Sequence, residues 1–282
     1  MISQALRILT LLALAACGDN LTPPPERDPY TPGDPATPTC WPDLDGRIEP
    51  EELQAALGVP ASYLVSPAGT ERSVDLAGAA DAGGLRVWDW STDLADDQIA
   101  ALSAAPLTGR WYAASFPGGQ FVAPLDAGAT LEAIYAHDER ALWLLGMASA
   151  EADPPQGRTL LVYDDPVPAY QFPLEPGAEW IAVGEIHDGT LLGLPYAGRD
   201  VYEVVDDALG RLELPDLSFT QAHRVRSRVT IEPAVGAPVS RRIVSFLFEC
   251  FGEVARAQSR DDETEEDFAS AVEVRRLGLN VR

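Results

Sequence analysis

Eight residues in the C-terminal third alternate in polarity and read Arg224-Val225-Arg226-Ser227-Arg228-Val229-Thr230-Ile231. Val225, Val229 and Ile231 fall on one side of an extended chain, and the three arginines fall on the other. A period of two predicts a β-strand with one apolar and one polar face. The nearby residues 243–248 are apolar on both faces, which predicts a central, buried strand. The chain is therefore expected to fold around a β-sheet.

Short apolar runs, separated by Gly, Pro and Asp, extend over most of the chain from residue 60 onward. Further strands are predicted at residues 85–90, 109–115, 130–135, 142–149, 159–163, 178–186, 253–259 and 270–277. Short helices are predicted at residues 50–57 and 94–102. The predicted fold class is mainly β: an antiparallel sheet, sandwich or partly open barrel, with one or two short helices.

The charged residues exclude several kinds of chemistry. The chain of 282 residues has 20 basic residues, all of them Arg, against 44 acidic ones, which gives a formal net charge of −24. The absence of Lys excludes a Schiff base, a P-loop lysine and a lysine general base. A chain with this much negative charge repels phosphate, and we therefore expect no nucleic-acid partner.

The N-terminus has the pattern of an export signal over residues 1–16. One positive charge at Arg7 precedes a short apolar stretch, and the sequence Leu14-Ala15-Ala16-Cys17 follows. This resembles the bacterial lipobox, which implies that Cys17 becomes the acylated (palmitate-bearing) first residue of the mature protein. The alternative is an ordinary secretory signal that happens to contain a Cys. Residues 17–39 are rich in Pro and predict an extended tether to the membrane. We expect a protein of the cell envelope, and favour the outer membrane.

The two remaining cysteines are Cys40 and Cys250. Because an exported protein meets an oxidising compartment, we predict a disulfide between them. Two separate buried thiols are the alternative.

Residues 40–59 contain a partial calcium-loop pattern. Asp43, Asp45, Glu49 and Glu52 fall at positions 3, 5, 9 and 12 of the EF-hand template, with Gly46 at its turn. Trp41 stands at position 1 and cannot bind calcium, so the segment resembles a degenerate EF-hand or a dockerin-type half-loop. The favoured alternative is a capped turn that starts a short helix. Calcium is the only cofactor that the sequence suggests.

The sequence contains few residues for catalysis. Its three histidines, His137, His187 and His223, belong to no recognisable catalytic motif, and the first two are predicted to lie in or beside hairpin turns. Residues 261–267, with six acids, are predicted to form an exposed hairpin tip. We therefore expect no enzyme, and a hydrolase is the least supported function.

Six tryptophans offer a second kind of site. Trp88, Trp90, Trp111 and Trp143 could line an aromatic groove for a lipid or a glycan. The favoured alternative is that these large rings fill the core of the β-rich fold.

Several short motifs carry a resemblance to a known group of proteins. They are F-P-L-x-x-G-x-x-W at 172–180, G-x-x-x-x-P at 210–215, F-x-x-A-x-R-V at 219–225 and G-x-V-x-R at 252–256. This set resembles uncharacterised cell-envelope lipoproteins common in myxobacteria, over about residues 130–277. The resemblance implies an antiparallel β-rich domain and transfers no catalytic residue.

These observations give a predicted organisation of four parts. Residues 1–16 are a lipoprotein signal peptide, 17–39 the lipidated Cys and tether, 40–59 an EF-hand-like turn and short helix, and 60–282 a β-rich domain. The predicted function is a lipid-anchored, non-enzymatic binding or structural module whose ligand is a protein, a lipid or a glycan. A lipid- or glycan-binding carrier or sensor, and a calcium-stabilised module, are the alternatives.

Overall fold

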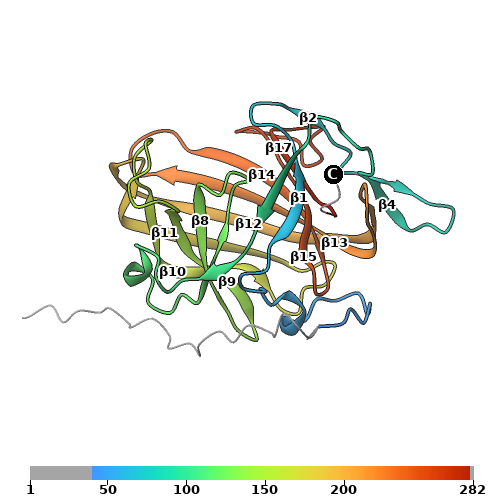
Figure 1. Ribbon diagram of the computed structural model, residues 1–282, viewed down its shortest axis with the longest axis horizontal. Helices are drawn as coiled ribbons and strands as arrows, with labels where there is room; N and C mark the ends of the chain where they lie inside the picture. Colours follow the sequence, from blue (N-terminus) through green and yellow to red (C-terminus); the bar gives the residue numbers. More distant parts are fainter. Residues whose placement is uncertain (1–39, 280–282) are drawn as a thin grey trace, which may run out of the picture.

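The computed structural model describes residues 40–279, and these form a mainly β structure (Figure 1). Fifteen strands belong to one large sheet, and β2 and β16 form a small second sheet. The elements are η1 (Pro50–Leu53), β1 (Ala61–Val65), β2 (Arg72–Ser73), β3 (Ala79–Ala80), β4 (Arg86–Asp89), β5 (Gln98–Leu102), β6 (Ala105–Pro106), η2 (Ala113–Ser115), β7 (Phe121–Pro124), β8 (Leu131–His137), β9 (Ala141–Ser149), β10 (Leu160–Gln171), β11 (Glu179–Leu191), β12 (Leu194–Glu213), β13 (Ser218–Pro233), β14 (Val239–Phe248), β15 (Gly252–Gln258), β16 (Ser270–Ala271) and β17 (Glu273–Leu277). The predicted fold class is confirmed.

The pair β13–β14 shows why the sequence folds in this way. The two strands are antiparallel, and Val225 lies opposite Ser245 while Arg224 lies opposite Phe246. As the alternation predicts, the valines of β13 and its arginines therefore point to opposite faces of the sheet. All neighbours in the large sheet pair antiparallel except β4, which pairs parallel with the end of β12.

The large sheet is rolled, so that its two ends approach each other. Its main path runs from β5 to β6, and these two end strands are separated in the chain by Ser103 and Ala104 alone. Across the roll, Arg275 Nη2 on β17 donates a hydrogen bond of 3.1 Å to the carbonyl oxygen of Leu125, just after β7. Bulges in β10, β11 and β12 let the long strands bend. The path has two ends, so the sheet is not a closed barrel.

The inner face of the roll carries two apolar clusters. One contains Trp180, Val225 and Leu247, and the second contains Leu144, Tyr163 and Ile186. The segment before β1 reaches the first cluster, because Ile48 pairs with Leu174 and is fully buried. Trp180, in the first of these clusters, is 8% exposed.

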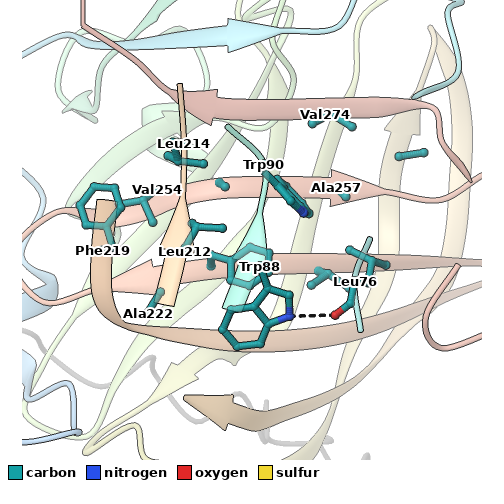
Figure 2. Close-up of a cluster of buried hydrophobic side chains, with 14 of the residues drawn as sticks. Leu76, Trp88, Trp90, Leu212, Leu214, Phe219, Ala222, Val254, Ala257 and Val274 are labelled. Carbon is teal, nitrogen blue, oxygen red and sulfur yellow. Dashed lines mark hydrogen bonds between the residues drawn. The ribbon is translucent and has the colours of Figure 1, made fainter. Parts of the chain in front are cut away.

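Two other clusters cover parts of the outer face. Around Trp88 and Trp90, the chain between β1 and β5 packs on Ala222, Val254 and their neighbours of β13–β15 (Figure 2). Figure 2 also shows the indole nitrogen of Trp88 donating to the carbonyl oxygen of Leu76, at 3.0 Å. On the other side, Tyr112 and Phe116 pack on Ile134 and its neighbours of β7–β9. Between these two covers, part of the outer face of β11–β14 stays open.

Four local predictions are wrong or need shortening. Residues 94–102 contain a turn and then β5 rather than a helix, and residues 109–115 form turns and η2 rather than a strand. The helix predicted at 50–57 is the short η1 alone, a 3-10 helix. His187 lies inside β11 and not in a hairpin turn.

The predicted disulfide is present, since Cys40 and Cys250 are bonded with a Cα–Cα distance of 5.5 Å. It joins the first described residue to the turn between β14 and β15. Within residues 40–279, no helix has the length and apolar content needed to cross a bilayer.

Candidate functional site

Three carboxylates meet next to the disulfide and form what we call the acidic site: Asp43, Glu52 and Glu249. One carboxylate oxygen from each lies within 4.8 Å of the others. Asp43 comes from the loop after Cys40, Glu52 from η1, and Glu249 from the turn that follows β14. The turn that contains Cys250 therefore also brings Glu249 next to Asp43 and Glu52.

Backbone hydrogen bonds orient these carboxylates. Asp43 Oδ1 accepts from the backbone nitrogen of Asp45 at 3.1 Å, and Glu52 Oε2 accepts from that of Glu49 at 2.9 Å. Leu44 has a left-handed backbone, with φ of 58°, and its nitrogen donates to Glu249 Oε2 at 2.8 Å. The loop therefore folds onto Glu249 rather than into solvent.

Glu249 is the most deeply placed of the three acids. Its side chain is 0% exposed, and its Oε1 atom has no hydrogen-bond partner. Among the described residues, none of the three carboxylates forms an ion pair with an arginine or a histidine. Burial raises the pKa of Glu52, and the nearby charges of Glu249, Asp43 and Asp45 raise it further. Negative charge is thus concentrated here without a protein counter-charge.

The structure brings together only two of the four residues expected to bind calcium. Asp43 and Glu52 belong to the acidic site, whereas Asp45 and Glu49 do not. Asp45 Oδ1 accepts from the backbone nitrogen of Arg47, and Glu49 takes part in the capping box of η1. Sequence reasoning missed Glu249, although its position beside Cys250 was a usable signal once the disulfide was predicted.

A second candidate site is a groove on the open part of the outer face, with a volume of about 810 Å³. Two rows of side chains cross its four strands, because the residues of each row are paired directly. The first row is Ile181, Glu203, Arg228 and Arg242, and the second is Glu179, Val205, Arg226 and Val244. The groove therefore presents both charges and apolar groups.

The arginines of the groove differ in how firmly they are held. Arg226 pairs with Asp207 at 2.8 Å and with Asp267 at 2.5 Å. Arg242 donates to the backbone carbonyl of Glu263. Arg228 has a longer contact, of 3.5 Å, with the carboxylate of Glu203. The segment 261–267 is exposed apart from Glu263, as predicted, and its acids pair with arginines of β13 and β14.

The four tryptophans expected to line an aromatic groove do not lie together. Trp88 and Trp90 are buried in the cluster of Figure 2. The centroids of their rings lie 4.9 and 5.1 Å from the ring centroid of Phe246. Trp111 and Trp143 pack against the other outer cluster. The favoured interpretation, that these rings belong to the core, agrees with this placement in two separate clusters.

Each of the three histidines has a different environment. His223 Nδ1 lies 2.7 Å from Asp206 Oδ2, and both side chains are fully buried. His187 lies beside Asp164 on the surface, and His137 packs against Phe172. Burial lowers the pKa of His137. Burial raises the pKa of Asp206, although the hydrogen bond from His223 opposes this shift.

The inner face also contains a polar cluster that crosses the roll. Glu253 Oε2 accepts from Ser245 and from Arg256 Nε, both at 2.8 Å, and Arg275 lies 3.5 Å from Oε1. Burial favours the neutral form of Glu253, but the charges of Arg256 and Arg275 outweigh it and lower the pKa. Burial raises the pKa of Tyr63 to about 12. Its hydroxyl donates to the backbone oxygen of Glu253 at 2.7 Å.

Comparison of the sequence with models of protein families, with curated proteins and with solved structures finds no match. Cys17, the residue expected to carry the lipid, lies outside the described residues.

Proposed function

We propose that this protein is a lipid-anchored, non-enzymatic binding module of the bacterial cell envelope, which holds a partner protein on the open outer face of β11–β14. The observation that carries this proposal is the groove between the two covers of that face. Both neighbouring parts of the outer face are packed under segments of the chain itself. The groove is the part that remains open to a partner.

The side chains of the groove favour a protein as the partner. Ile181 is 71% exposed near the start of β11, and acids and arginines line the groove with it. A mixture of apolar and oppositely charged groups suits a transient protein interface. A glycan or an acyl chain would be better served by exposed aromatic rings or a dry apolar cavity. The tryptophans that could have supplied such rings lie in the two outer clusters.

The N-terminal sequence supports the anchor. The lipobox-like residues before Cys17 and the Pro-rich residues 17–39 would place the β-rich domain at some distance from the membrane surface. The motifs that resemble those of bacterial envelope lipoproteins favour the same compartment, and we favour the outer membrane. A net charge of −24 argues against nucleic acid as the partner.

The non-enzymatic part of the proposal rests on where the histidines lie. His137, His187 and His223 have separate neighbours, so they do not form a shared nucleophile–base arrangement. The buried Asp206–His223 pair connects strands β12 and β13. A structural role explains this pair without a substrate.

Photo-crosslinking in intact cells tests the binding function. A photoreactive amino acid at position 181 places the probe in the groove, and the same amino acid at position 235 is the matched control. Val235 is also apolar and is 92% exposed, but it lies in the β13–β14 connection outside the groove. We expect a discrete crosslinked protein from position 181 and none of that mass from position 235. Equal products from both positions, or none from either, would contradict the proposal.

A further inference from the structure

We propose that Asp43, Glu52 and Glu249 bind one divalent cation, calcium, and that this ion ties the N-terminal segment to the turn after β14. The proposal concerns a different site from the groove, so it does not depend on the partner protein. It names Glu249, 205 residues away from the loop residue Leu44 that it contacts, as the central ligand.

Glu249 provides the main argument. Its side chain is completely buried, and its Oε1 atom has no hydrogen-bond partner. One oxygen of the same carboxylate lies within 4.8 Å of an oxygen of Asp43 and of Glu52. A buried carboxylate oxygen is unfavourable unless a proton, a donor or a cation meets it. The other oxygen, Oε2, is held by the backbone nitrogen of Leu44, so the carboxylate cannot turn away without losing that bond.

The charges around the site give the second argument. Three carboxylates converge, and no arginine of the described chain pairs with any of them. The chain has no Lys that could supply the missing charge. A divalent cation would neutralise most of this charge while using all three acids at once.

The distances suit a calcium ion. Calcium binds oxygen at about 2.3–2.6 Å, so two oxygens on one ion are separated by up to about 5 Å. The three oxygens here lie within 4.8 Å of one another. Their type also fits, because calcium and magnesium both prefer carboxylate oxygens, with water completing the shell. The wider and more adaptable shell of calcium suits ligands drawn from two segments that are distant in the sequence.

Two backbone hydrogen bonds orient the carboxylates of Asp43 and Glu52. Those from Asp45 to Asp43, and from Glu49 to Glu52, fix the direction of two ligands through their backbone nitrogens. The degenerate EF-hand pattern implies a calcium loop within one short stretch of sequence. The acidic site differs from this, because it includes Glu249. It is a bridge between two distant segments, adjacent to the bond between Cys40 and Cys250.

The test uses the full-length chain, purified in detergent with a chelator and then dialysed. Wild type, Glu249→Gln, Asp43→Asn and the matched control Asp45→Asn are titrated with calcium chloride by calorimetry, and their thermal unfolding is followed. The control removes an acid from the same loop, but its amide oxygen still accepts from the nitrogen of Arg47.

We expect calcium at about 1 mM to raise the unfolding temperature of wild type and of Asp45→Asn by about 5 °C. Glu249→Gln and Asp43→Asn should show no rise and no heat of binding. Without calcium, Glu249→Gln should unfold at or above the temperature of wild type, because it removes an uncompensated buried charge.

Three results would overturn the proposal. The first is the absence of heat and of stabilisation in wild type at millimolar calcium. The second is a rise that persists in both Glu249→Gln and Asp43→Asn. The third is loss of binding in Asp45→Asn, since it would return the site to the loop alone. Magnesium at the same concentration should stabilise less, and stabilisation by magnesium alone would contradict the choice of calcium.

Discussion

Cys40 and Cys250 are joined across 210 residues, so the bond closes nearly the whole described chain into one loop. Between them lies every strand from β1 to β14, and Cys250 follows β14 directly. The bond therefore ties the segment before the sheet to a central part of it. A bond over such a long loop restricts the unfolded chain strongly.

We predict that Cys40→Ser lowers the free energy of unfolding by about 2–5 kcal/mol. Thermal or urea unfolding in oxidising buffer measures this loss. A reductant should bring wild type down to the stability of the variant and should leave the variant unchanged. Equal stability of the two oxidised proteins would contradict the role given to the bond.

The outer cluster around Trp88 should contribute strongly to stability. Its ring is 0% exposed, packs on Phe246, and lies beneath the guanidinium of Arg224. We expect Trp88→Ala to cost about 3–5 kcal/mol, because it leaves a large cavity. Trp41→Ala is the control, since Trp41 is 76% exposed, and it should change stability by less than about 0.5 kcal/mol. Urea unfolding distinguishes the two, and similar losses would refute the assignment of Trp88 to the core.

Glu253 should make the fold sensitive to acid. Its folded-state pKa is lowered by Arg256 and Arg275 despite its burial, so its ionised form stabilises the protein above the unfolded-state value of about 4.3. This contribution is lost as the pH falls through the lower, folded-state pKa. We predict that Glu253→Gln costs about 3 kcal/mol at pH 7.

Unfolding of both proteins at pH 7 and pH 3 measures this contribution. The difference between wild type and Glu253→Gln should narrow at pH 3, because protonation of Glu253 removes the same charge. A difference that is constant with pH would show that the ionised carboxylate is not the stabilising form.

Asp200 should act in the opposite direction. Burial raises its pKa, although the hydroxyl of Tyr163 donates to it at 2.7 Å and opposes the shift. A raised carboxyl pKa favours folding below the unfolded-state value of about 3.9, and this contribution is lost as the pH rises through the folded-state pKa.

We therefore predict that Asp200→Asn gains stability relative to wild type between pH 4 and pH 8. The gain is about 1.4 kcal/mol for each unit that separates the two pKa values. Urea unfolding at several pH values measures it. A relative loss with rising pH would mean that the charged form of Asp200 is the favoured one in the fold.

The strands β13 and β14 could be predicted because their pattern is local, whereas the longest strand, β12, was missed from the sequence. Alternation in β13 and the apolar run in β14 specify both the strand and its buried face before any partner is known. The helix prediction at 94–102 is wrong. Leu94, Ile99 and Leu102 fit a helical spacing, but pairing with β1 determines the strand β5. That pairing is set by distant residues, and short segments follow it.

The acidic site was only half predictable for the same reason. Asp43 and Glu52 are close in sequence and stood out in the calcium-loop pattern, but Glu249 reaches them through the fold. The groove could not be predicted at all, because its two rows depend on the register of four strands. A single sequence specifies which residues face outward, but not which neighbours they meet.

Labelling with a fatty-acid analogue tests the proposed lipid anchor at Cys17. Wild type, Cys17→Ser and the control Cys40→Ser are expressed at full length in a Gram-negative bacterium, labelled in culture and purified. We expect acyl label on wild type and on Cys40→Ser, and none on Cys17→Ser. Absence of label from wild type, or equal label on Cys17→Ser, would contradict it.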